Sequence, residues 1–348
     1  MRHVGDQVLN FIRCFTRHGT RRWPSSARLL GLLGLLVLSL VPAAGMAQNL
    51  TIAVSRTSLS LPLYVAETQK LFADEGLSVQ TRECIGGQRC ITQLFDGQAQ
   101  LATASELPVM FHSFARADYA IVATFATSAQ NLKLVARKSA GIDSAGQLTG
   151  KRIGTAKGTS AHYFLDSFLL FNGVDPKKVD RVWLQPEQIE ATLKAGRIDA
   201  AAIWEPFAYQ SLQALAGDGL VLPSERVYTE SFNLIASRKL ITEREADIVK
   251  LLRAVQRAQR WIQDHPVEAQ AILKARLQTD QAFIDATWKD FTYRMSLDQS
   301  LLSTIEGEAR WALREGHVPP DSKTPNYLQF IDAGPLRKAV PAAAILLK

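Results

Sequence analysis

The sequence of 348 residues predicts an α/β protein with parallel sheets and a helical C-terminal part. Short apolar strands alternate with helix-like stretches from residue 49 to about residue 204, which is the pattern of parallel sheets covered by helices on both faces. After about Thr242 only helix-like stretches follow. The composition, with 47% hydrophobic and 21% charged residues, is that of a globular protein, and the length suggests two domains.

Seven apolar stretches predict the strands. A polar turn, a glycine or a helix-like stretch bounds each of them. Gly76 and Gly97, for example, each end a helix-like stretch just before a predicted strand. The predicted strands are 50–54, 77–81, 100–104, 119–123, 133–137, 152–155 and 200–204.

The C-terminal part predicts four consecutive helices. Aliphatic and aromatic residues such as Leu251, Val255 and Trp261 recur there at helical spacing, which indicates faces packed in a core. The predicted helices are 242–264, 267–277, 281–295 and 298–315, with Pro266 and Gly316 among the residues that separate or end them.

Residues 1–47 have the organisation of a secretory signal. Six arginines precede an uncharged apolar run, Leu29–Val41, which is too short to span about 30 Å of hydrocarbon. Gly45 and Ala47 are the small residues expected before a cleavage site. The segment therefore predicts export to the periplasm; the alternative is an uncleaved anchor over Leu29–Ala47.

Most of the net charge of +7 lies in this N-terminal segment. Its six arginines oppose one acidic residue, so the remainder holds 34 basic and 32 acidic residues. Nucleic-acid binding needs clustered lysine and arginine, and a nearly neutral body gives no reason to expect it.

The exported chain keeps two of the three cysteines, Cys84 and Cys90, around Gly86-Gly87. In an oxidising compartment this pair can close a short disulfide loop. Two buried free thiols or a redox site are the alternatives. No Cys-x-x-Cys spacing or Cys/His cluster is present, so the sequence predicts no metal site.

The stretch from Lys157 to Tyr163 predicts an anion site. It follows the strand 152–155 and opens a helix, and Gly158 lets the backbone approach a ligand. The first helical N–H groups and the helix dipole attract negative charge, and Thr159 and Ser160 add hydroxyl donors. The alternative is simple capping of the helix by Thr159 or Ser160.

Three further strand ends carry polar groups. The corner Trp204-Glu205-Pro206 offers an indole wall and a carboxylate where ligands bind in open α/β sheets, or it is a structural turn into a helix. The loops Ser105–Pro108 and Ser58–Pro62 follow two other strands, and loop chemistry alone would also explain them.

Catalytic signatures are missing from the sequence. No G-x-S-x-G, H-E-x-x-H or G-x-G-x-x-G motif occurs, and the four histidines after the signal form no recognisable triad. The sequence therefore predicts no catalytic residues and no cofactor.

The order of several segments resembles that of a known family, the substrate-binding proteins of ABC importers for nitrate, sulfonates and taurine, which also includes binders of thiamine precursors. The similarity extends from about Asn49 to Pro341. The matching segments are 61–66, 71–77, 148–154, 157–165, 196–206, 308–311 and 335–336.

The resemblance implies a type II periplasmic-binding fold of two α/β lobes. The first lobe would comprise 48–135 and 230–341, and the second 136–229, with hinge crossings near Leu134 and Phe232-Asn233. The solute would bind in the cleft between the lobes. The expected ligand-binding residues are Ser60, Leu61, Ser105, Glu106, Ser128, Gly158, Thr159, Ser160, Ala161, His162, Trp204 and Glu205.

A solute receptor is the function that this resemblance implies, with an ABC permease in the inner membrane as partner and a monomeric state as the default. The anion site favours a sulfonate, and Glu106 and Glu205 favour a solute that also carries an amine, such as taurine. The alternatives are nitrate or bicarbonate, a thiamine-precursor pyrimidine, a pyrimidine-forming enzyme with His162 as base, and a membrane-tethered sensor domain. The cysteine-rich iron motif of the pyrimidine synthases is absent, which disfavours the enzyme.

Overall fold

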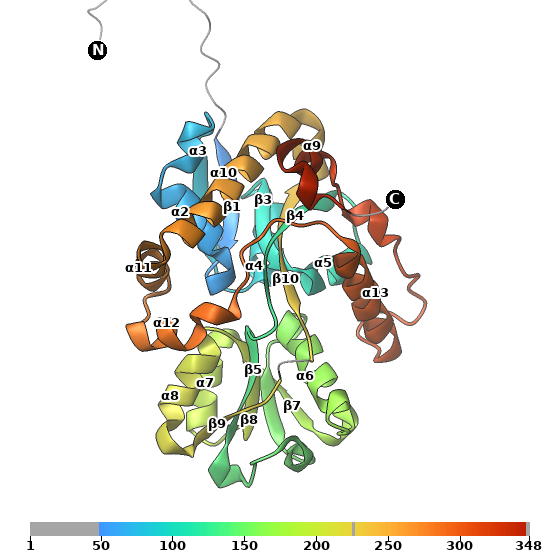
Figure 1. Cartoon of the computed structure of the whole chain (residues 1–348). Coiled ribbons are helices and arrows are strands. Elements are labelled where there is room, and N and C mark those ends of the chain that lie inside the picture. Colours follow the sequence, from blue (N-terminus) through green and yellow to red (C-terminus); the bar gives the residue numbers. More distant parts are fainter. Residues whose placement is uncertain (1–48, 225–226, 346–348) are drawn as a thin grey trace, which may run out of the picture. The chain divides into compact units, whose positions relative to one another are not determined.

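The computed structural model describes residues 49–224 and 227–345, which form two five-stranded sheets with helices packed around each (Figure 1). The predicted secretory signal, with Cys14, lies outside the described residues. Two separate hydrophobic cores accompany the two sheets, and the core of the second sheet contains only residues between Leu132 and Leu222.

The first sheet has the strand order β2-β1-β3-β10-β4. β1 runs parallel to β2 and β3, whereas β10 runs antiparallel to β3 and β4, so the sheet is mixed rather than parallel as predicted. The reason is that β10 enters from the second sheet and fills the space between two strands that came earlier. Its strands are β1 (Leu50–Ser55), β2 (Val79–Cys84), β3 (Leu101–Ser105), β4 (Tyr119–Ser128) and β10 (Glu230–Ser237).

The second sheet has the order β7-β6-β8-β5-β9, and β5 runs antiparallel to both of its neighbours. The sequence did not predict β7, β9 or β10; β7 is short and half exposed, which weakens the apolar pattern of a strand. The strands are β5 (Leu132–Arg137), β6 (Arg152–Thr155), β7 (Asp180–Trp183), β8 (Ala200–Trp204) and β9 (Gly219–Leu222).

Two segments, 129–131 and 223–229, connect the sheets. They lie a few residues before the expected crossings, because Leu134 is paired within β5 and Phe232 and Asn233 are paired within β10. Apolar strands flank both crossings, so hydropathy alone gives no sign of where the chain leaves one sheet for the other.

The helices around the first sheet come from both ends of the chain. α4 packs on β1 and β3, α10 packs on α2 and α14, and α13 packs on α5. The helix predicted over 281–295 is shorter than expected. α12 ends at Thr287, and a 3-10 turn and an extended stretch bonded to β4 follow it. These helices are α2 (Leu61–Thr68), α3 (Leu71–Asp74), α4 (Gly87–Phe95), α5 (Glu106–Ser113), α9 (Arg238–Glu243), α10 (Glu245–Asp264), α11 (Pro266–Leu277), α12 (Gln281–Thr287), α13 (Gln299–Arg314) and α14 (Gly334–Ala339).

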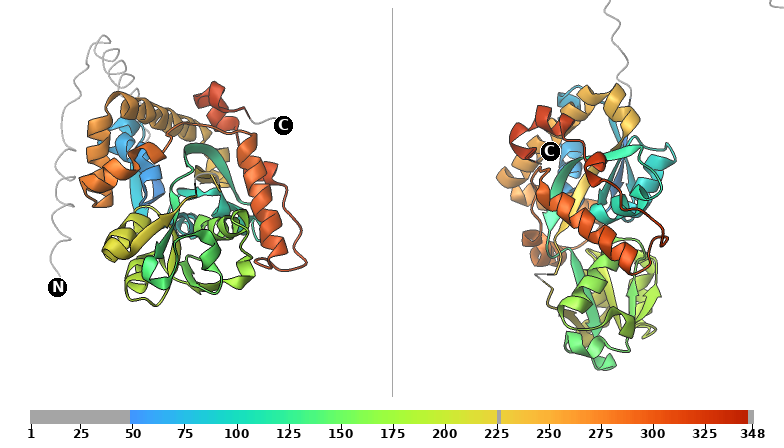
Figure 2. Two further views of the ribbon diagram at one scale, coloured as in Figure 1. Left: turned by 60° about the horizontal axis from the view of Figure 1, so that its bottom comes forward. Right: turned by 90° about the vertical axis from the view of Figure 1, so that its right-hand side faces the viewer.

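The second sheet carries α6 (Ser160–Phe171), α7 (Pro186–Lys194) and α8 (Phe207–Leu215), which Figure 2 shows from two further sides. Short 3-10 turns complete the structure: η1 (Ser58–Ser60), η2 (Lys138–Ala140), η3 (Ala145–Leu148), η4 (Pro176–Lys178), η5 (Ala216–Asp218), η6 (Trp288–Asp290), η7 (Tyr327–Phe330) and η8 (Pro341–Ala343).

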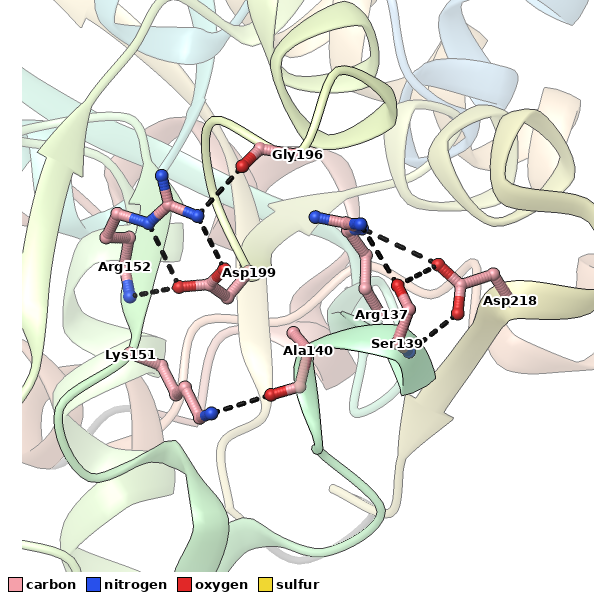
Figure 3. Close-up of polar contacts among 8 residues, drawn as sticks. All are labelled: Arg137, Ser139, Ala140, Lys151, Arg152, Gly196, Asp199 and Asp218. Atoms are coloured by element: carbon pink, nitrogen blue, oxygen red, sulfur yellow. Dashed lines mark hydrogen bonds and ion pairs between the residues drawn. The ribbon is translucent and has the colours of Figure 1, made fainter.

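Ion pairs hold the edge of the second sheet where β6 and β8 begin (Figure 3). The Arg152 guanidinium donates to both carboxylate oxygens of Asp199 and to the carbonyl of Gly196. Gly196 has a φ of +68°, the left-handed conformation that favours glycine. The network belongs to the scaffold, because ligands in such sheets bind at the opposite, carboxyl ends of the strands.

Cys84 and Cys90 form a disulfide that joins the end of β2 to the first turn of α4. Among the described residues, no helix is both long and apolar enough to cross a membrane.

Candidate functional site

Three helices begin where strands end, and their first turns meet at one place. α4 follows β2, α5 follows β3 and α6 follows β6. None of the three N-cap residues, Gly86, Ser105 and Thr159, makes a side-chain capping bond. The first N–H groups of these helices therefore lack a side-chain acceptor, and three positive helix ends face one site.

A small cavity lies at this meeting point. Its volume of about 20 Å³ suffices for one ordered water, so a solute of several heavy atoms can enter only when the two lobes move apart. Both lobes contribute to its wall, which consists of Ser55, Thr57, Leu59, Gly86, Gly87, Gln88, Ser105, Pro108, Asn131, Thr159, Ser160, Trp204, Glu230 and Phe232.

Several polar atoms of this wall have no partner. Thr57 Oγ1, Gln88 Oε1 and Asn131 Oδ1 are all buried without a hydrogen bond. An unsatisfied buried polar atom costs about 1–3 kcal/mol, and functional sites are the usual place where such a cost persists. These atoms supply unused hydrogen-bonding capacity for a solute.

The Glu230 carboxylate is the charged group of the cavity. It is 3% exposed, and its oxygens accept from Ser160 Oγ at 2.6 Å and from Asn131 Nδ2 at 2.6 Å. Burial raises the pKa of Glu230, while the hydrogen bonds from Ser160 and Asn131 oppose that rise. No lysine or arginine lines the described cavity wall, so this carboxylate has no cationic partner there.

Two more buried carboxylates, Glu106 and Glu308, lie behind the cavity. The Tyr228 hydroxyl bonds to Glu106 and is 3.4 Å from Glu308 Oε1, and the Ser231 amide donates to Glu106 Oε2 at 3.0 Å. Burial, followed by repulsion from Glu230, raises the pKa of Glu106 to about 8. Burial and repulsion from Glu106 likewise raise the pKa of Glu308. The interior beside the cavity is therefore rich in carboxyl groups.

Four of the sequence-predicted residues line the cavity: Ser105, Thr159, Ser160 and Trp204. The capping alternative for the α6 start is wrong, because Thr159 Oγ1 donates to the Ala156 carbonyl and Ser160 Oγ donates to Glu230.

Five others from the strand-end loops do not reach the cavity wall. Leu61 is a fully buried core residue, and Glu106 lies behind the wall as described above. The polar side chains at these strand ends are instead bonded to other groups of the protein, and sequence spacing does not reveal those partners. Ser60 donates to the Ser55 carbonyl, Ser128 donates to the Asp290 carbonyl, and Glu205 pairs with Lys133 at 3.3 Å.

The remaining three lie around the α6 start. Gly158 has a φ of +73°, the left-handed conformation that favours glycine, and does not line the cavity. Ala161 packs in the second core. His162 is buried against Trp183, Trp311 and His317, since it lies on the face of α6 turned towards α13. Burial lowers the pKa of His162 to about 3.

The most informative wall residues that the sequence did not predict are Gly86, Gly87, Gln88, Asn131 and Glu230. The sequence predicts Gly86-Gly87 only as part of the cysteine loop, although a glycine pair between a strand and a helix is also typical of a helix start open to a ligand. A Cβ on Gly86 would lie 3.4 Å from the Trp204 ring, so the indole of the second lobe packs over this turn. Glu230 gave no local signal, because nothing in its own segment marks it as facing a cleft.

Comparison with known proteins places this geometry in a family. A model of the family described as NMT1/THI5 like matches residues 58–269, more than half of the chain. The chain belongs to this family.

Relatives with binding functions cover most of the chain. The taurine-binding periplasmic protein of Escherichia coli (strain K12) is 28% identical over 323 residues, which cover 90% of this chain and 91% of that protein. A putative aliphatic sulfonates-binding protein of Bacillus subtilis (strain 168) is 25% identical over 236 residues, covering 66% of this chain and 70% of that protein.

Solved structures show the fold. The periplasmic aliphatic sulphonate binding protein SsuA of Escherichia coli superposes with a TM-score of 0.71 at 20% identity, covering 81% of this chain and 97% of that one. The two-lobed periplasmic-binding fold implied by the sequence resemblance is thus confirmed, as is the resemblance itself.

Proposed function

We propose that this protein is the solute-binding component of an ABC importer, exported to the periplasm, and that it captures a small organic solute carrying a sulfonate-type anion and an amine. The observation that carries the proposal is that one cavity combines three uncapped helix starts with the Glu230 carboxylate, beside which the described wall has no lysine or arginine. The names of the taurine- and sulfonate-binding relatives support the same chemistry.

The helix starts provide the anion end of the site. Backbone N–H groups near Gly87 and Ser160 lie at the positive ends of α4 and α6, and helix N-termini bind sulfate-like groups through these donors. The Thr57 hydroxyl, which has no partner within the protein, adds a further donor. An anion between these helices is held by both lobes at once, which is what a solute must do to favour closure.

Glu230 provides the cation end. An ammonium group beside this buried carboxylate would stabilise its charged form, and Ser160 and Asn131 already orient it. Trp204 and Phe232 line the same cavity and offer aromatic faces to a cation. A solute with an anion alone would instead meet the repulsion of Glu230.

Calorimetric titration of taurine and ethanesulfonate, which lacks the amine, tests this reading. We expect the wild-type protein to prefer taurine, and Glu230→Gln to weaken taurine by about 1–3 kcal/mol while ethanesulfonate binds as well or better. Glu190→Gln, which changes an exposed glutamate of α7, is the matched control and should leave both affinities unchanged. Equal taurine affinity in the wild type and Glu230→Gln would refute the cation end, and failure of both solutes to bind would refute the sulfonate class.

A thiamine-precursor aminopyrimidine is the second candidate, and a specific observation favours it. A carboxyl group with a raised pKa can donate to or accept from ring nitrogens and amino groups, and Trp204 and Phe232 can contact a planar ring. Binding of the pyrimidine in the same titration, with no taurine binding, would select this candidate.

We propose a receptor rather than an enzyme. The base of the enzymatic alternative, His162, does not line the cavity, and its lowered pKa makes it a weak base. We further propose that the closed, solute-loaded form is what an inner-membrane permease recognises, and that the receptor acts as a monomer.

A further inference from the structure

A second group of polar side chains lies away from the cavity, between α6 and the end of α13. His162 and Asp166 are one turn apart on the same face of α6, and His317 follows α13. One nitrogen of each histidine and one Asp166 oxygen all lie within 4.8 Å of one another. Figures 1 and 2 show α13 passing beside α6, so the fold joins residues that are far apart in the sequence.

His162 is unusual for a buried histidine. It is 1% exposed, and neither of its ring nitrogens has a hydrogen-bond partner. His317 Nε2 is also buried without a partner. A neutral imidazole has one N–H donor and one acceptor nitrogen, and leaving both unsatisfied is costly. The neighbouring rings of Trp183 and Trp311 contact His162 edge to face and offer its nitrogens no conventional acceptor.

The third side chain is held in the way that a ligating carboxylate usually is. Asp166 accepts from Arg181 Nη2 at 2.6 Å and from Trp311 Nε1 at 3.0 Å, so one donor fixes each oxygen and a lone pair remains on both. Arg181 also partly neutralises Asp166, which disfavours ions that depend on carboxylate charge, such as Ca²⁺. A set of two imidazoles and one carboxylate suits Zn²⁺ and related transition-metal ions.

We propose that His162, Asp166 and His317 form a binding site for one divalent transition-metal ion of the Zn²⁺ class. His162 and Asp166 belong to the helix of the second lobe, while α13, which leads to His317, packs in the first core. The ion therefore joins the two lobes at a place away from the solute cavity. His317 is only partly buried, which provides an entry path and room for water as the fourth ligand. Sequence spacing did not predict this site, because no two of its ligands form a recognised metal motif.

Titration of the chelator-stripped protein with ZnCl₂ against a chromophoric competitor, together with thermal unfolding, tests the site. We expect one equivalent of Zn²⁺ to bind and to raise the melting temperature, because an ion bound only by the native state stabilises it. His162→Gln and His317→Gln should each weaken Zn²⁺ at least tenfold. His265→Gln, which changes an exposed histidine stacked on Trp261, is the matched control and should bind as the wild type does.

Three results would overturn the proposal: no stoichiometric Zn²⁺ binding by the wild type, unchanged binding by both His162→Gln and His317→Gln, or Ca²⁺ binding as tight as that of Zn²⁺. If His162→Gln does not fold, the partly exposed His317 still allows the test. No solute is present in this experiment, so its outcome is independent of the proposed transport function.

Discussion

At the scale of single residues, the cavity depends on carboxyl groups that are buried without cations. Glu230 faces the cavity, and Glu106 and Glu308 stand behind it with Tyr228 between them. Burial is the first cause of the raised pKa of all three carboxyl groups, and repulsion between carboxylates adds to it for Glu106 and Glu308. Such groups make the stability of the protein depend on pH and make the cavity receptive to a positive group.

The raised pKa of Glu106 predicts that stability falls as the pH rises. The pKa of Glu106 lies near 8 in the folded protein against an ordinary value of 4.5, so between these pH values the native state binds more protons than the unfolded state. Its contribution is complete below about pH 4.5 and is lost as the pH rises through about 8. We expect the free energy of unfolding to fall by up to about 1.4 kcal/mol per pH unit in this window.

Denaturant unfolding of the wild type and of Glu106→Gln between pH 5 and pH 8 measures this slope. Glu106→Gln should flatten the profile, because the amide does not titrate, whereas Glu268→Gln, which changes a glutamate with a 61% exposed side chain, should leave it unchanged. A Glu106→Gln profile as steep as that of the wild type would contradict the assignment.

The sequence predicted the chemistry of single residues only where local geometry decides it. Ser160 was correctly placed at a helix start, because a strand and a glycine precede it and an apolar helix follows it. Glu230 was missed because its role depends on β10 returning beside β4 and on Asn131 across the crossing, contacts between positions distant in the chain. His162 was misplaced, because its side chain leaves α6 on the face that contacts α13 and not towards the cavity.

At the scale of elements, the start of α4 is the part of the site that packing fixes most tightly. The disulfide Cys84–Cys90 joins its first turn to β2, and Gly86 and Gly87 place its backbone on the cavity wall. A Cβ on Gly87 would lie 2.5 Å from Ala104 Cβ and 2.6 Å from Ala104 Cα, so β3 leaves no space for a side chain there. Most strands and the C-terminal helices were predictable from their periodicity, whereas this close approach was not.

Gly87→Ala should therefore push α4 away from β3. We expect a loss of about 1–3 kcal/mol in stability, as for other overpacked sites, and a weaker affinity for the solute. Gly146→Ala is the control, because a Cβ there would have no atom within 4 Å. Calorimetry and denaturant unfolding report both quantities, and equal behaviour of the two variants would contradict the packing argument.

The disulfide gives a prediction of its own. Thiol labelling of the unfolded, unreduced protein should find neither Cys84 nor Cys90 free. The double variant Cys84→Ser/Cys90→Ser should lose about 2 kcal/mol of stability, since the closed loop restricts the unfolded chain. Addition of a reductant should lower the melting temperature of the wild type but not of the double variant; two labelled thiols in the wild type would refute the bond.

At the scale of the whole described structure, two lobes meet around a cavity that holds little more than one water. The contacts across the lobes include an exposed ion pair, Arg89 with Glu187 at 2.6 Å, which contributes little because water screens it. The bond between Ser160 and Glu230 also joins them. The Trp311 indole adds a third, since its Nε1 donates to Asp166. A solute that binds both lobes adds to such contacts and thereby shifts the balance towards the closed form.

The crystal structure of the protein with taurine tests the central claim most directly. The account predicts the sulfonate against the amide groups at the starts of α4 and α6, and the ammonium group within hydrogen-bond distance of the Glu230 carboxylate, with the lobes closed over the solute. Taurine bound outside this cavity, or held by one lobe alone with Glu230 still bonded only to Ser160 and Asn131, would contradict it.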